Sequence, residues 1–75
     1  MIKKEQLQKL RVQYPVGTRI ELILMDDPAA PPVGTKGTVT GVDDIGDILV
    51  DWDNGSVLNV VPEVDRIRKV ANFDE

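Results

Sequence analysis

From Gly17 onward, apolar residues recur at every second position in short runs, and turns that contain glycine or proline separate the runs. A period of two places successive side chains on opposite faces of a β-strand. The pattern therefore predicts short strands, each with one face suited to burial. The five predicted strands cover residues 19–24, 37–42, 47–52, 57–61 and 66–70.

The connections between these runs differ in kind. Residues 26–34 contain three prolines, which cannot donate to a ladder, and this predicts a long loop. Gly46 and residues 53–56 predict two tight hairpin turns, since glycine and Asn-Gly tolerate left-handed backbone. Gly41 predicts a bulge, and residues 62–65, which begin Pro-Glu, predict a single helical turn.

Residues 3–13 predict a short helix, because nearly all of them are good helix formers. Leu7, Leu10 and Tyr14 form one narrow apolar stripe along it. Pro15 ends the helix, since the residue before a proline is driven out of the α region. A helix of this length is marginal alone. We expect its stripe to cap one open end of the β-structure, with docking on another protein as the alternative.

The order of these elements is typical of one fold. A long first loop, two hairpins, a helical turn and a closing strand predict a mainly β protein, a small five-stranded SH3-like barrel with a short N-terminal helix. Curling into a barrel removes the exposed edges of short strands. An OB-fold fits less well, because residues 53–56 form a turn where that fold has a helix. We expect the helix in residues 1–15, the barrel in 16–70 and a flexible tail in 71–75.

Residues 14–20, 34–39 and 52–56 together resemble a small bacterial family of unknown function, the one numbered 4314. The resemblance extends over roughly residues 14–70. It implies a bacterial setting, often on phages and conjugative elements, and it brings no activity and no binding residues. A looser similarity to mind-bomb-type, KOW and tudor modules favours the SH3-like barrel and transfers no ligand.

The composition excludes most catalytic chemistry. The chain has 75 residues with no Cys and no His, so it offers no disulfide, no thiolate or imidazole ligand and no imidazole base. Ser56 is the single serine and has no His or Cys to activate it. We therefore expect a protein that is not an enzyme and that uses no cofactor and no metal.

Charge is distributed unevenly along the chain. Residues 1–20 carry five basic residues against one acidic residue, whereas residues 26–65 carry nine acidic residues against Lys36, a net charge of −8. Such a surface repels phosphate and disfavours nucleic acid as a partner. No run approaches the roughly 20 apolar residues that cross a bilayer, so we expect no membrane partner and a cytoplasmic location.

The proline loop is the first candidate contact surface. Its residues Pro28, Pro31, Pro32 and Val33 lose little entropy on binding, with a rigid spacer as the alternative role. Leu49, on the neighbouring hairpin, would be a second apolar anchor beside Val33.

Two further candidates have simpler interpretations. Trp52 could be a binding platform, but it is in phase with other apolar residues of its strand, which favours the core. Asp43, Asp44 and Asp47 could bind a cation, but their spacing does not fit an EF-hand loop, and aspartate is a favoured turn residue.

These observations predict a non-catalytic SH3-like interaction module that binds a protein partner, as a monomer or a weak homodimer. The alternative is a DNA-associated accessory protein or an acidic mimic of nucleic acid. The mimic would present five carboxylates, those of Asp43, Asp44, Asp47, Asp51 and Asp53.

Overall fold

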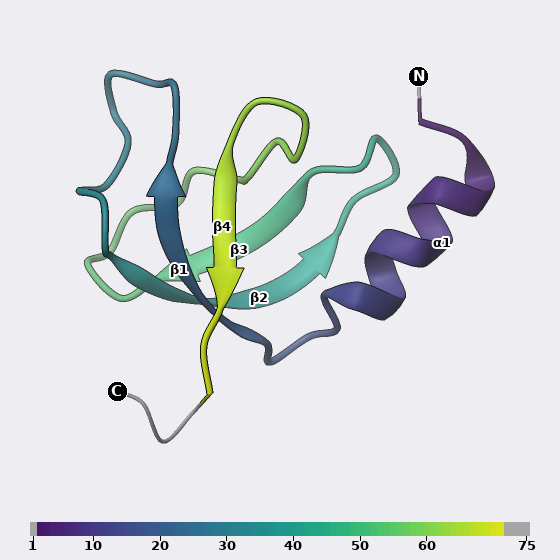
Figure 1. Ribbon diagram of the computed structural model, residues 1–75, viewed down its shortest axis with the longest axis horizontal. Helices are drawn as coiled ribbons and strands as arrows, with labels where there is room; N and C mark the ends of the chain where they lie inside the picture. The colour runs from purple at the N-terminus through teal and green to yellow at the C-terminus, as the bar shows by residue number, and fades with distance from the viewer. Residues whose placement is uncertain (1, 72–75) are drawn as a thin grey trace.

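The protein folds as one short helix beside a single curved antiparallel sheet (Figure 1). The structure, a computed structural model, describes residues 2–71, so residues 72–75 of the predicted tail lie outside the described residues. The strands pair in the order β3-β2-β1-β4. The elements are α1 (Lys4–Gln13), β1 (Arg19–Leu24), β2 (Lys36–Val42), β3 (Ile48–Trp52) and β4 (Arg66–Lys69). The predicted mainly β fold with an N-terminal helix is confirmed.

Residues 57–61, predicted as a fourth strand of five, do not form a strand. Val60 alone makes an isolated bridge to Ile48, with two backbone hydrogen bonds of 2.8 Å. The turn before it explains the difference. The N–H of Gly55 donates to the carbonyl of Trp52, and Gly55 has a φ of 89° whereas Asn54 does not adopt positive φ. A type I turn followed by a left-handed glycine gives a longer loop than the predicted Asn-Gly hairpin.

The register of that bridge decides which side chains enter the core. A two-residue loop at Asn54-Gly55 would place Val61 opposite Ile48, but the structure places Val60 there. A shift of one residue turns every side chain to the other face. Val60 is accordingly fully buried, and Val61 remains 37% exposed.

Three predictions about the connections are confirmed. The β2–β3 register shifts between Val39 and Gly41, as a bulge requires. Gly46 has a φ of 89°. The N–H groups of Val64 and Asp65 both donate to the carbonyl of Val61, which forms one helical turn before β4.

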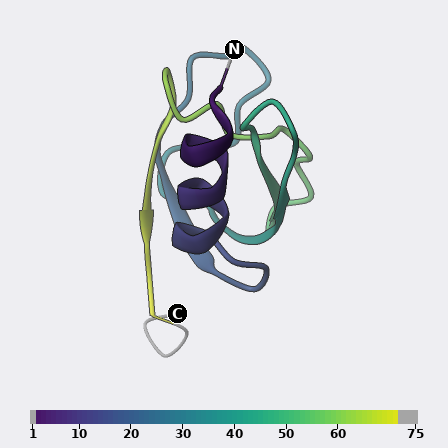
Figure 2. The same ribbon diagram turned by 90° about the vertical axis from the view of Figure 1, so that its right-hand side faces the viewer.

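Trp52 lies at the centre of the core. It is 1% exposed, and its indole Nε1 donates to the carbonyl of Leu58 at 2.8 Å. Leu10 and Tyr14 from the helix stripe pack against this core, and α1 lies beside the open side of the curved sheet (Figure 2). The prediction that Trp52 belongs to the core is confirmed, so its ring is not available as a surface platform. The fully buried core residues around it are Ile20, Leu22, Val39, Ile48 and Val60.

Gly37 lets β2 approach the Trp52 ring. A Cβ at this position would lie 2.7 Å from Cγ1 of Val50 and 2.9 Å from Cε3 of Trp52. We expect Gly37→Ala to lower the free energy of unfolding by about 2 kcal/mol, because overpacking a core forces side chains out of their preferred rotamers. Urea denaturation measures this change.

Gly41→Ala is the matched control in the same strand. Its Cβ would meet only Cδ1 of Leu49, at an ordinary 3.7 Å. We expect its effect to stay below about 1 kcal/mol. Equal losses in the two variants would show that contact with Trp52 is not the reason for glycine at Gly37.

Candidate functional site

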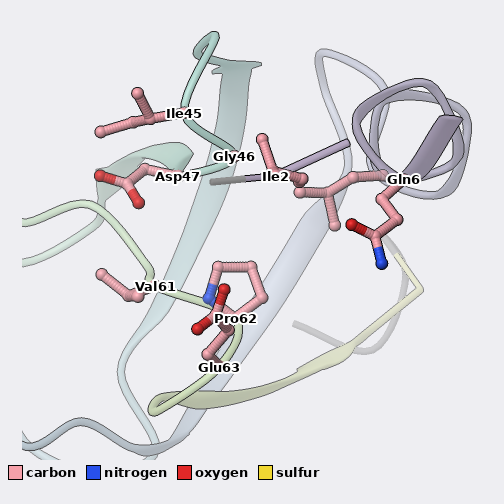
Figure 3. A pocket seen from close by; sticks show the side chains of 9 residues that line it. Ile2, Gln6, Ile45, Gly46, Asp47, Val61, Pro62 and Glu63 are labelled. Carbon is pink, nitrogen blue, oxygen red and sulfur yellow. The ribbon is translucent and has the colours of Figure 1, made fainter. Parts of the chain in front are cut away.

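Several of the connecting loops gather at one end of the molecule. The proline loop, the β2–β3 turn, the turn before β4 and the start of α1 all lie at the upper end in Figures 1 and 2. A groove of about 300 Å³ opens there between α1 and the two turns (Figure 3). The residues that line this groove are Ile2, Gln6, Leu10, Ile45, Gly46, Asp47, Val61, Pro62 and Glu63.

The first wall of the groove is the turn of residues 43–47. Oδ1 of Asp43 accepts the N–H groups of Ile45 and Asp47, at 3.2 and 2.8 Å, and this holds the turn closed. The predicted turn role of Asp43 is confirmed. A Cβ on Gly46 would lie 2.7 Å from Cδ1 of Ile2, so glycine at this position lets Ile2 rest against the turn.

The second wall is the turn before β4, and Asp65 holds it in place. Asp65 is only 6% exposed. Its Oδ2 accepts the N–H of Val61 at 2.8 Å, and its Oδ1 accepts the N–H of Asp26 at 3.4 Å. One buried carboxylate therefore joins this turn to the base of the proline loop. Our sequence reasoning counted Asp65 among the surface acids, although its place at the end of a Pro-Glu turn is one where a carboxylate often accepts backbone N–H groups.

The third wall is the helix, which Arg11 attaches to the first wall. Its guanidinium donates to the carbonyl of Val42 at 3.1 Å and forms an ion pair with Asp44 at 2.9 Å. At the start of the helix, Oε1 of Gln6 accepts the N–H of Lys3 at 3.1 Å. The Arg11 contacts hold α1 against the β2–β3 turn, so the helix is both a cover for the core and a wall of the groove.

The groove combines an apolar surface with uncompensated negative charge. Its lining contains no Lys or Arg. Within residues 2–71, the carboxylates of Asp47 and Glu63 have no hydrogen bond and no ion pair. Desolvation raises the pKa of Asp47 above its ordinary value of 3.8, and repulsion from Asp43 and Asp65 adds to the rise.

Two other aspartates are paired with arginines. Asp53 forms a bidentate pair with Arg19, with contacts of 2.9 and 2.6 Å. This hydrogen bonding lowers the pKa of Asp53 below its ordinary value. Asp44 is paired with Arg11, as described above. Within the described residues, no group of three or more acidic, His or Cys side chains could hold a metal ion.

The residues predicted from the sequence as a contact surface do not come together at one place. Pro28, Pro32 and Val33 are exposed on the proline loop, with Val33 70% exposed, whereas Pro31 is buried. Leu49 is half-buried on β3. Of the nine predicted residues only Asp47 lines the groove.

Sequence reasoning therefore missed most of the groove. Its apolar part comes from Ile2, Leu10, Ile45, Val61 and Pro62, which belong to three separate segments. Ile45 offered a local signal, because a large apolar residue in an Asp-rich turn is unusual. The other positions gave none.

The chain matches the family described as Domain of unknown function (DUF4314) over residues 3–70. It belongs to this family, as the resemblance of its turn motifs indicated. No curated protein matches the chain. No helix among residues 2–71 is long and apolar enough to cross a membrane.

Replacing Asp47 with Asn should stabilise the protein at neutral pH. The folded chain holds the Asp47 proton more tightly than the unfolded chain does, so ionisation of this carboxyl opposes folding. The free-energy cost of this ionisation to the folded state grows as the pH rises from 3.8 through the raised pKa, and it reaches its full value above that pKa. We expect the gain in unfolding free energy to be largest at neutral pH and to vanish below pH 3.8, as measured by urea denaturation across a pH series.

Asp53→Asn is a control for which we expect a change in unfolding free energy of the opposite sign. Because Arg19 lowers the pKa of Asp53, the ionised carboxylate favours folding above 3.8, and this contribution is lost as the pH falls through the lowered value. The variant should therefore lose stability at neutral pH and match the parent in strong acid. Effects of the same sign in the two variants would contradict this electrostatic assignment.

Proposed function

We propose that the chain is a non-catalytic protein-interaction module with an SH3-like barrel fold, and that its partner binds in the groove between α1 and the turns of residues 43–47 and 61–65. The observation that carries this proposal is a groove of about 300 Å³, with both apolar and acidic residues in its lining, at the end of the fold where several loops gather. Concave, mostly apolar sites with a few polar groups are the usual form of binding sites.

The order of the strands supports the SH3-like barrel. The sheet runs β4-β1-β2-β3, and Val60 continues it by bridging to β3. From Val60 the chain passes through one helical turn directly into β4 at the opposite edge. A curved sheet whose two edges are joined by a single turn is close to a closed barrel, and closure protects strand edges from unwanted pairing.

Two observations favour a protein partner over mimicry of nucleic acid. A mimic would need several free carboxylates on one surface, but Asp43 is engaged with backbone N–H groups, and Asp44 and Asp53 are paired with arginines. The groove, by contrast, offers exposed apolar side chains, and Ile45 is 74% exposed. Exposed apolar residues beside polar groups are typical of protein contact sites.

Selection from a random peptide library on the folded chain tests this proposal. We expect selected peptides to shift the backbone NMR signals of Gly46, Asp47, Val61 and Glu63, which border the groove. Replacing the apolar anchor with Ile45→Ser should weaken binding about fivefold, which corresponds to a contact of about 1 kcal/mol.

Val57→Ser is the matched control, because Val57 is 81% exposed and does not line the groove. It should leave peptide affinity unchanged. Signals that move on the proline loop alone, or equal losses in the two variants, would rule out the groove as the binding site.

A further inference from the structure

The groove has two chemically different sides. In Figure 3, Ile2 and Gln6 form the helix side, and the carboxylates of Asp47 and Glu63 lie on the side formed by the turns. Apolar side chains come from both sides, with Leu10 on the helix and Val61 and Pro62 in the turn. A ligand in the groove therefore meets apolar surface on both sides and negative charge on the side of the turns.

The chain pairs several of its other carboxylates with arginines, but not these two. Asp44 is paired with Arg11, Asp53 with Arg19, and Glu21 with Arg68 at 2.6 Å. The half-buried Asp47 is instead repelled by Asp43 and Asp65, so its ionised form is held where burial and neighbouring charge both disfavour it. Charged groups that a fold leaves in a destabilising place are candidates for function.

Two neighbouring arginines are engaged elsewhere. Arg11 is attached to the carbonyl of Val42 and to Asp44. Nη1 of Arg66 donates to the carbonyls of Pro62 and Asp65, at 3.4 and 3.1 Å. Neither arginine has a contact with the carboxylate of Asp47 or Glu63 within residues 2–71. Within residues 2–71 no cation contacts either carboxylate, so both are open to a positive charge that a partner brings.

We propose that the groove binds a basic side chain, lysine or arginine, of a partner polypeptide. The aliphatic part of that side chain lies against Ile2, Ile45 and Val61, and its charged end reaches Asp47 and Glu63. This inference rests on the proposed function and names the kind of residue that the site recognises.

Other ligand classes fit the groove less well. A purely apolar side chain would desolvate Asp47 further without compensation. An anionic group would be repelled by both carboxylates. A bare divalent cation needs several oxygen ligands, and residues 2–71 contain no cluster of three suitable side chains. Lysine and arginine meet both requirements, because each joins an apolar stem to a charged end.

Four short peptides that differ at one central residue test this inference. The central residue is lysine, arginine, norleucine or glutamate, and the flanking sequence is the same uncharged alanine-rich segment. Norleucine retains the aliphatic stem of lysine and removes the charge. We expect the lysine and arginine peptides to shift the NMR signals of Gly46, Asp47 and Glu63, and to bind about fivefold more tightly than the norleucine peptide. The glutamate peptide should not bind, and added salt should weaken only the basic peptides.

A double variant, with a single variant elsewhere as its charge control, tests whether Asp47 and Glu63 cause the preference for lysine over norleucine. Asp47→Asn combined with Glu63→Gln should make the lysine and norleucine peptides bind equally. Asp51→Asn, which removes an exposed carboxylate of β3 outside the groove, should leave the lysine preference in place. A preference that survives the double variant would overturn the inference.

The remaining outcomes separate this inference from the proposed function. Equal binding of the lysine and norleucine peptides in the groove of the parent protein would overturn the basic-ligand inference and leave the groove as a protein-binding site. No binding by these peptides or by library-selected peptides would overturn both. Groove signals that move on dilution without peptide would identify a second copy of the chain as the occupant, which also overturns the inference.

Discussion

The fold depends on the burial of one indole ring. Trp52 packs against the Cβ-free position of Gly37 and donates its N–H to the carbonyl of Leu58. The carbonyl of Leu58 thereby accepts a hydrogen bond from a side chain, whereas in the predicted fourth strand it would have accepted one from a neighbouring strand. This hydrogen bond also draws residues 58–60 over the core, and Val60 then pairs with Ile48. The same register leaves Val61 and Pro62 facing out, where they form one wall of the groove. In a small domain with little apolar surface to bury, a single large ring can set both the core and the site.

Six carboxylates of this chain fall into three kinds by their partners. Asp43 and Asp65 accept backbone N–H groups and hold the two turns that form the groove. Asp44 and Asp53 form ion pairs that connect elements distant in the sequence. Asp47 and Glu63, at the surface of the groove, have neither kind of partner within residues 2–71. Carboxylates that look alike in the composition therefore differ in their structural surroundings, and only their partners in the folded chain distinguish them.

The helix has a double role that follows from its position. Leu10 and Tyr14 pack against the core, while Ile2 and Gln6 line the groove at its N-terminal end. Arg11 connects the helix to the β2–β3 turn, so displacement of the helix would open the core and the groove together. Isolated helices of this length are marginal in water, and the docking contacts supply the stability that its sequence lacks.

The sequence by itself determined the local elements. Alternation after Gly17, the helix formers before Pro15 and the glycines at Gly41 and Gly46 were sufficient to predict four strands, the helix, the bulge and the left-handed turn. Each of these depends on residues close together in the chain, which is where propensity and periodicity carry information.

Tertiary structure alone decided the burial of Asp65 and the existence of the groove. The predicted fourth strand failed because one left-handed glycine, not two left-handed residues, shaped the turn after Trp52. The groove could not be predicted because it joins side chains from α1 and two turns, and no periodicity relates positions as distant as Ile2, Ile45 and Pro62. Their proximity results from how the sheet curves around Trp52, a long-range packing effect that no local pattern encodes.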